Sequence, residues 1–135
     1  MRYLLDTNAL SEPVRRRPAP AFMRRLERLY AHVCTSVLCV GEMVYGARRV
    51  PHGGRYEAYL REVVLPHLPV LGVDLEVATT YGELRAAAER GGRKRADLDL
   101  LVAATALRHD LVVVTRNLRD FQDLPGLTVE DWTLA

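Results

Sequence analysis

Short apolar runs alternate along this chain with longer segments that have the pattern of helices. We interpret the apolar runs as buried strands, at residues 2–5, 32–36, 69–73, 111–115 and 127–131. Buried strands that alternate with helices are typical of a parallel sheet covered by helices on both faces. The sequence therefore predicts an α/β protein with three layers, α/β/α, around a central, mainly parallel sheet of four to five strands.

Capping residues mark where several of the helices begin. Ser36 and Asp74 each precede a helical segment, and their side chains can accept a hydrogen bond from its first turn. A helix opened by Pro18 and Pro20 is also expected to run to about Tyr30, because proline is favoured in a first turn. A shorter helix is expected to start at Asn8, directly after the first strand.

Length and composition favour a single domain over residues 1–135. The chain is 49% hydrophobic and carries a net charge of +2, which suits a domain with a real core and excludes little else. No apolar run approaches the length of a membrane span, and the first residues lack a signal-peptide pattern. Cys34 and Cys39 do not have zinc-site spacing, so we expect reduced thiols and a cytoplasmic location.

Polar residues follow two of the predicted strands at the point where each strand ends. Asp6 follows the first strand, and Thr115, Asn117 and Asp120 end or follow the fourth. In open parallel sheets, ligands bind at the carboxyl ends of the strands. A lone Asp after a strand is more often a helix cap, but Asn8 is itself a good cap and is expected to leave Asp6 free for a ligand.

Glu42 is the only charged residue between positions 36 and 47. The segment is apolar on most of its circumference, so we expect a largely buried helix. The neighbouring Gly41 and Gly46 would let another segment or a ligand come close. A buried carboxylate needs a cation, a hydrogen-bond donor or a proton, unless its side chain reaches solvent.

Asp97 and Asp99 stand at the start of a predicted helix. Two residues apart on a helix corresponds to a rotation of about 200°, so only one of them can face a given pocket. The other is expected to cap the helix or to face solvent. Asp97 is closer to the basic loop, where it could pair with Arg93 or Arg95.

Together these residues indicate a cation site that acts on phosphate. Several carboxylates at one sheet edge repel each other unless a cation lies among them, and their hard oxygen atoms suit Mg²⁺ or Mn²⁺. Such a site can polarise a phosphate and activate water for in-line attack. The nearby Arg93, Lys94 and Arg95 would then contact phosphate groups of the substrate.

Four segments in order resemble the motifs of PIN-domain ribonucleases, and specifically the VapC toxins of bacterial type II toxin–antitoxin pairs. They are "LLDTNAL", "TSVLCVGEMVYGARR", "DLDLLVAATAL" and "LVVVTRNLRDF". The ending "LTVEDW" is also similar to the usual end of such chains. Each motif alone is weak, but four in this order at suitable separations are a specific pattern.

The resemblance implies a PIN-like fold and magnesium-dependent cleavage of RNA, for example in a tRNA anticodon loop. It assigns Asp6, Glu42 and Asp99 to the acidic centre, with Glu42 either binding metal or positioning the attacking water. Many relatives carry a fourth acid where this chain has Asn117, so Asn117 or Asp120 could supply that position. The resemblance also implies a homodimer and an antitoxin that occupies the active-site groove.

Thr7 and Thr115 complete the expected site, where they would contact substrate or shape the surroundings of the acids.

Three other functions fit parts of the pattern. A receiver-type signalling domain also has an acid after strand one, but it needs an acceptor Asp after strand three and a Lys after the last strand. A phosphatase with the D-x-D motif needs an acid where Asn8 stands. A catalytically inert PIN-like module that binds RNA or protein is the remaining alternative, although retention of the three acids argues against it.

Overall fold

A five-stranded parallel sheet forms the centre of the protein, of which the computed structural model describes residues 1–134. All four pairings between neighbouring strands are parallel, which confirms the predicted sheet. The strands are β1 (Tyr3–Leu5), β2 (Val33–Ser36), β3 (Val70–Leu71), β4 (Val112–Val114) and β5 (Val129–Glu130).

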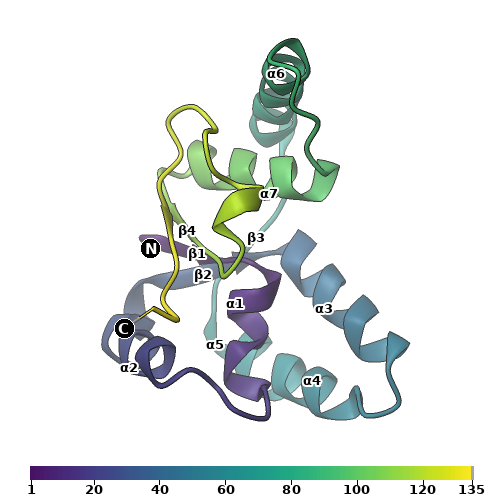
Figure 1. Ribbon diagram of the computed structural model, residues 1–135. Coiled ribbons are helices and arrows are strands. Elements are labelled where there is room, and N and C mark those ends of the chain that lie inside the picture. Colours follow the sequence, from purple (N-terminus) through teal and green to yellow (C-terminus); the bar gives the residue numbers. More distant parts are fainter. Residues whose placement is uncertain (135) are drawn as a thin grey trace.

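Helices cover the sheet on both sides, as the three-layer prediction requires. Figure 1 shows α6 and α7 on one side of the sheet, and α1, α3 and α4 on the other. The helices are α1 (Thr7–Ser11), α2 (Pro20–Leu29), α3 (Val37–Arg49), α4 (Gly54–Tyr59), α5 (Leu65–His67), α6 (Leu75–Arg90) and α7 (Asp97–Arg108). Short 3₁₀ helices are η1 (Glu12–Val14), η2 (Tyr30–His32) and η4 (Leu118–Asp120), and η3 (Leu60–Val64) is a π-helical segment between α4 and α5.

Two of the predicted helix caps are confirmed. The Ser36 hydroxyl accepts a hydrogen bond from the Cys39 amide at 3.2 Å and begins α3. The Asp74 carboxylate accepts one from the Val77 amide at 2.8 Å and begins α6. Each cap satisfies an N–H group that has no partner within its own helix. The start of α1 differs from the prediction.

The sheet order places the two halves of the chain on either side of β1. The order is β3-β2-β1-β4-β5, so the connection reverses direction between β1 and β4. Receiver-type domains instead have the order 2-1-3-4-5, which rules out that alternative for this chain. Open parallel sheets bind ligands at the carboxyl end of such a reversal. No helix in the described part of the chain is long and apolar enough to cross a membrane.

Packing and backbone hydrogen bonds fix β1, the strand at which the order of the sheet reverses. The Asp6 amide donates to the Val114 carbonyl at 3.1 Å, which extends the β1–β4 pairing to the first residue after β1. On the opposite end of the sheet, Trp132 is 1% exposed and packs edge-on against Tyr3, with ring centroids 5.1 Å apart. β1 is therefore fixed at both ends, and so is the start of the segment that follows it.

Candidate active site

Asp6 caps α1, so the prediction that Asn8 would cap it is wrong. The backbone at Asp6 is extended, and its Oδ1 accepts a hydrogen bond from the Ala9 amide at 3.1 Å. Asn8 lies one residue inside the helix, where its side chain points toward β4 instead of the helix start. A carboxylate in the capping position is oriented by the helix itself, so capping and a ligand-binding role coexist in Asp6.

Asn8 connects the ends of β1 and β4. Its Nδ2 lies 3.4 Å from both Asp6 Oδ2 and Thr115 Oγ1, and its Oδ1 accepts a hydrogen bond from the Arg116 amide at 2.8 Å. The Thr115 hydroxyl also accepts a hydrogen bond from the Asn117 amide at 2.9 Å. Thr115 is only 1% exposed, so it shapes this corner of the site from within.

A pocket of about 420 Å³ opens at this edge of the sheet. Its wall contains the acids Asp6, Glu42, Asp99 and Asp120. Other lining residues include Thr7, Asn8, Ser11, Leu38, Val102, Asn117 and Phe121. We call this the acidic pocket. Asp6, which follows β1, and residues from α1, α3, α7 and the segment after β4 thus meet around one space, although these segments are far apart in the sequence.

The acids of the pocket perturb one another. Burial raises the pKa of Asp6 to about 6, against hydrogen bonds from Thr115 and Ala9 that lower it, and the charge of Asp99 raises it further. Burial also raises the pKa of Asp99 to about 6, and the charges of Asp120 and Glu42 add to the effect. The ionised forms of Asp6 and Asp99 therefore carry an electrostatic cost that a bound cation would relieve.

The donor set fits a hard cation that keeps part of its water shell. In residues 1–134, no three carboxylate, imidazole or thiolate side chains are grouped closely enough to form a ready-made metal cage. Mg²⁺ does not need such a cage, because it is usually held by one or two carboxylates together with waters and substrate phosphates. Asp6 and Asp99 are the two acids of the pocket with raised pKa values and are the best candidates for that role.

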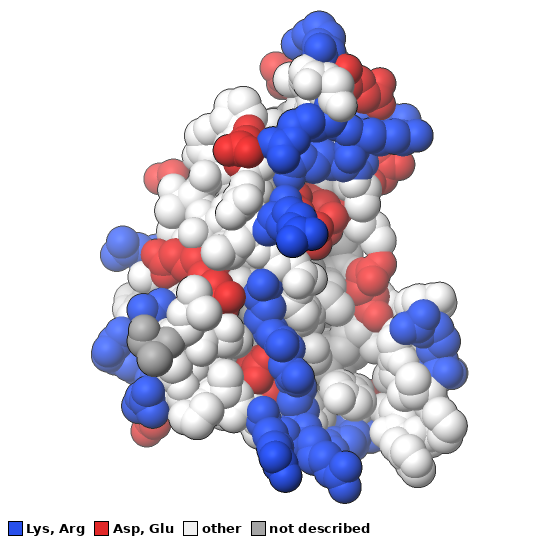
Figure 2. Space-filling view, in the orientation of Figure 1, with Lys and Arg blue, Asp and Glu red and all other residues white. Residues whose placement is uncertain are grey.

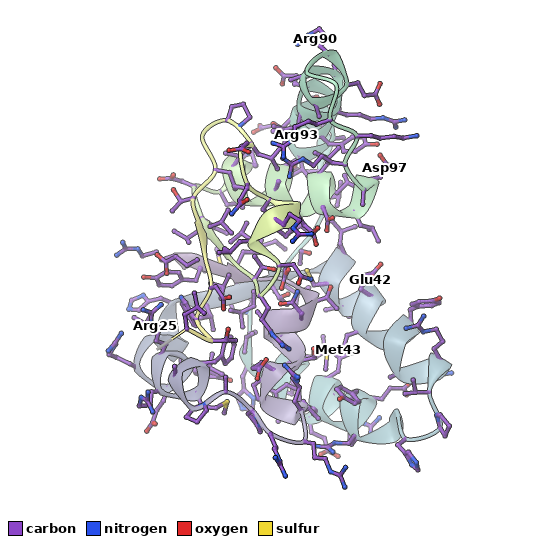
Figure 3. All side chains as sticks on the ribbon, viewed as in Figure 1. Arg25, Glu42, Met43, Arg90, Arg93 and Asp97 are labelled. Atoms are coloured by element: carbon purple, nitrogen blue, oxygen red, sulfur yellow. The ribbon has the colours of Figure 1, made fainter. Side chains whose placement is uncertain are left out.

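Glu42 lies at the junction of the acidic pocket with a second, largely apolar pocket of about 240 Å³. Its helix is less buried than predicted, because Tyr45 is 60% exposed and Val37 is 47% exposed. No atom beyond the local backbone lies within 4 Å of a Cβ placed at Gly41 or Gly46, so no other segment packs closely there. Figure 3 labels Glu42 and Met43 on α3, which lies below α7 and its labelled Asp97 in this view.

Asp97 lies outside the acidic pocket. It accepts a hydrogen bond from the Tyr81 hydroxyl at 2.9 Å and pairs with Arg85 at 3.6 Å, which fastens the start of α7 to α6. Ala96 occupies the cap position of α7. Asp97 faces solvent, as one of the two predicted outcomes required, with 60% of its side chain exposed. It neither caps α7 nor pairs with Arg93 or Arg95, because α6 supplies partners that sequence spacing did not suggest.

The basic loop before α7 is fastened to the segment after β4. Arg93 forms an ion pair with Asp123 at 2.7 Å. Arg95 donates to the carbonyls of Asp120, at 2.9 Å, and Gln122. These arginines line a separate pocket of about 180 Å³ next to the loop. Arg95 holds the backbone of Asp120, which lines the acidic pocket together with Asp99, so the loop helps to shape that pocket. A contact between the loop and substrate stays a prediction.

Glu12 and Arg116 were not singled out in the sequence, and both lie beside the site. Glu12 is 0% exposed and carries an ion pair with Arg116, at 3.4 Å. One signal was present, because Glu12 is the only charged residue in the segment from Thr7 to Val14. The same kind of isolation had drawn attention to Glu42.

Comparison with known proteins assigns the family. The PIN domain profile matches residues 3–127. The protein is a PIN-domain protein of the VapC type. It is 32% identical over 132 residues to the tRNA(fMet)-specific endonuclease VapC of Salmonella typhimurium, with 98% of each chain covered. It is 33% identical over 124 residues to Toxin FitB of Neisseria gonorrhoeae, covering 87% of this chain and 89% of FitB.

Solved structures of VapC-type proteins share the fold. The PIN-domain chain superimposes on the DNA-bound VapBC of Salmonella typhimurium with a TM-score of 0.88, at 31% identity and 98% coverage of both chains. The FitAcB structure from Neisseria gonorrhoeae gives a TM-score of 0.88 at 30% identity, covering 98% of this chain and 99% of that one. The predicted PIN-like fold is thereby confirmed.

Proposed function

We propose that this PIN-domain protein is a metal-dependent endoribonuclease, the toxin of a type II toxin–antitoxin pair. The observation that carries the proposal is the acidic pocket, in which Asp6, Glu42, Asp99 and Asp120 line one space at the reversal point of the sheet. Relatives that match the full length of the chain are named as ribonucleases, among them Ribonuclease VapC2 of Haemophilus influenzae, at 29% identity.

The acids of the pocket and Asn117 would bind Mg²⁺ or Mn²⁺ through their side-chain oxygen atoms. Asp6 is oriented by the Ala9 amide and by Asn8, and Asp99 faces it across the pocket. A bound ion would polarise the phosphodiester and lower the pKa of a bound water. Asn117 lines the pocket and can offer a neutral carbonyl oxygen. Where many relatives have four acids, this chain would therefore have three carboxylates and one amide.

Glu42 is placed to act on the attacking water. It lines the pocket from α3 and has no ion-pair partner within the described residues. In the proposed reaction the water oxygen forms a bond to phosphorus, the bond from phosphorus to the leaving ribose oxygen breaks, and Glu42 accepts the water proton. The leaving oxygen takes a proton from solvent. Asp120, beside Asp99, adds negative charge that strengthens cation binding.

The substrate is proposed to be RNA, with tRNA as the first candidate. The relative from Salmonella typhimurium is named as specific for tRNA(fMet), and a relative from Shigella flexneri carries the same name. Lys94, together with Arg93 and Arg95, would lie along the RNA backbone at one rim of the pocket. Thr7 is half-buried in the pocket wall and would contact the substrate near the reacting phosphate.

An antitoxin is the proposed protein partner. The similar structures include VapBC and FitAB assemblies bound to DNA. The apolar pocket beside Glu42, with Met43, Ala47 and Tyr56 in its wall, adjoins the acidic pocket and could be covered by the same partner. We also propose that the protein acts in the cytoplasm as a homodimer, as the family resemblance implies.

Incubation of the purified protein with total tRNA tests the proposal against the inert-module alternative. We expect cleavage with Mg²⁺ or Mn²⁺, and none with excess chelator. The Asp99→Asn variant, folded by circular dichroism, serves as the control for contaminating nuclease. Intact tRNA under all metal conditions, or equal cleavage by wild type and Asp99→Asn, would leave a binding module as the better description.

A further inference from the structure

Glu12 is a fully buried carboxylate that joins three separate segments. Its Oε1 accepts hydrogen bonds from Arg15, at 3.2 Å, and forms an ion pair with Arg116, at 3.4 Å. Its Oε2 accepts a hydrogen bond from the Ala19 amide at 2.8 Å. Glu12 does not line the acidic pocket, so it has no role in the proposed cleavage reaction.

Arg116 is directly connected to the acidic pocket. Its amide donates to Asn8 Oδ1, and the same Asn8 side chain contacts Asp6 Oδ2. Its guanidinium group turns the other way and reaches Glu12, although 38% of the side chain remains exposed. Two hydrogen bonds thus separate the backbone of Arg116 from the Asp6 carboxylate, which places Arg116 at the rim of the pocket.

Positive charge extends away from Arg116 over the surface. Arg15 and Arg116 share the single carboxylate of Glu12, so a net positive charge remains, and 41% of the Arg15 side chain is exposed. Arg55 is exposed, and its guanidinium donates to the Val14 carbonyl next to Arg15. Figure 2 shows a band of blue side chains over α1 toward the lower end of the molecule, beside the region where red side chains gather.

We propose that Arg15, Arg55 and Arg116 form a phosphate-binding track that holds the RNA backbone on one side of the acidic pocket, and that Glu12 is the positioning residue that fixes Arg116 and Arg15. The inference rests on the proposed ribonuclease function. A pocket lined by four acids repels RNA, so cations at its rim must hold the strand. A guanidinium fixed by a carboxylate still has free N–H groups for phosphate oxygens.

The arginines of the basic loop before α7 cannot by themselves bind the RNA backbone at the pocket. Arg93 is already paired with Asp123, and both terminal nitrogens of Arg95 donate to backbone carbonyls. Arg55, by contrast, donates from one terminal nitrogen to a single carbonyl, that of Val14. Arg15 and Arg116 instead share one carboxylate between two cations, so a phosphate can compete for them without leaving a buried charge unpaired. The strand would therefore cross the acidic pocket between the loop that carries Lys94 and the track.

Binding of purified total tRNA tests the track without cleavage. The full chain carrying Asp99→Asn is titrated with tRNA in chelator at several salt concentrations. We expect Arg116→Gln and Arg15→Gln each to weaken binding about tenfold and to lower the slope of log affinity against log salt by about one. Arg61→Gln is the matched control, because Arg61 is an exposed arginine paired with Glu62 at 3.8 Å, outside the track.

Glu12→Gln separates positioning from bulk charge. The substitution makes the surface more positive, so a purely electrostatic effect would strengthen tRNA binding. We expect weaker binding instead, because the amide no longer fixes the two guanidinium groups. If Glu12→Gln does not fold, the two arginine variants still decide the proposal.

Unchanged tRNA affinity and salt slope in both Arg116→Gln and Arg15→Gln would overturn the track, as would an equal loss in Arg61→Gln. In the otherwise wild-type chain, the arginine variants should raise KM for tRNA cleavage and leave kcat within about twofold. A wild-type chain that binds but does not cut tRNA would refute the proposed function and leave the binding result standing. Weaker capture of the antitoxin with unchanged tRNA binding would assign the track to a protein partner and overturn the proposal.

Discussion

Asp97 and Asp99 are two residues apart on α7 and have entirely different surroundings. Asp97 is fastened to α6 through Tyr81 and Arg85, whereas Asp99 lines the acidic pocket. The 3.6-residue period of the helix accounts for the separation. The pair therefore offers a chemically identical substitution at two positions of one helix turn, only one of which belongs to the proposed site.

We expect Asp99→Asn to lower the rate of RNA cleavage by at least about a hundredfold, the scale for losing an essential charge-stabilising group. Asp97→Asn should retain most activity and cost at most about 1 kcal/mol, because its ion pair with Arg85 is exposed. Cleavage assays on both folded variants decide between them. If Asp97→Asn were the inactive one, the metal ligand of α7 would have to be reassigned.

The stability of the metal-free protein should fall as the pH rises from about 4 to above 6. Asp6 and Asp99 have folded-state pKa values of about 6, above their ordinary value of 3.8, so the folded state binds protons more tightly than the unfolded state in this range. Stabilisation by these groups is complete below pH 3.8 and is lost as pH passes 6. Urea unfolding in chelator at a series of pH values measures it.

Asp6→Asn is the matched variant for that measurement. Asparagine can still cap α1, so the substitution removes the buried charge and keeps the helix start. At pH 8 without metal, we expect the variant to be more stable than wild type, by at most about 3 kcal/mol for a pKa difference of this size. Asp97→Asn should keep the wild-type pH dependence. An Asp6→Asn protein that is less stable than wild type at pH 8 would mean that the buried carboxylate does not destabilise the fold.

Divalent metal should stabilise the wild-type fold. Because the ion binds the folded acids and offsets their repulsion, Mg²⁺ or Mn²⁺ at ten times its dissociation constant would add about 1.4 kcal/mol to the free energy of unfolding. Calorimetry at constant ionic strength, with sodium chloride as the control salt, measures the shift. Asp99→Asn should lose most of it, and an unchanged wild-type transition at saturating metal would rule out the site as drawn.

Expression of the chain alone should arrest bacterial growth, and co-expression of the neighbouring antitoxin gene should relieve the arrest. The expectation follows from a ribonuclease whose pocket is open to solvent. Growth curves with the Asp99→Asn chain, expressed at equal soluble level, provide the control. Normal growth at high soluble levels of the wild-type chain would favour the inert module.

Local patterns in the sequence were enough to predict the sheet and much of the helix layer. Ser36 and Asp74 cap the helices that follow them because a cap depends on neighbours three residues away. The same local rule failed at Asn8. Two candidates, Asp6 and Asn8, were available two residues apart, and the choice depended on the extended backbone at Asp6, whose amide pairs with β4.

Local patterns in the sequence could not predict contacts between distant segments. Glu12 meets Arg116, and Arg95 meets the carbonyl of Asp120, only because the fold brings their segments together. Charge clusters such as Arg93 to Arg95 therefore indicate where cations are, but not which of them already have partners. An isolated charge in an apolar segment, as at Glu42, was the more informative signal.

The parallel pairing of β1 with β4 also determines how late in synthesis the acidic pocket can form. Asp6 leaves the ribosome early, but its neighbours in the pocket, Asp99, Asn117 and Asp120, are added only after most of the chain. A polypeptide that ends before β4 lacks the strand against which Asp6 is fixed, and it also lacks Asn117 and Asp120. Translation products that stop short of β4 therefore cannot assemble the complete acidic pocket.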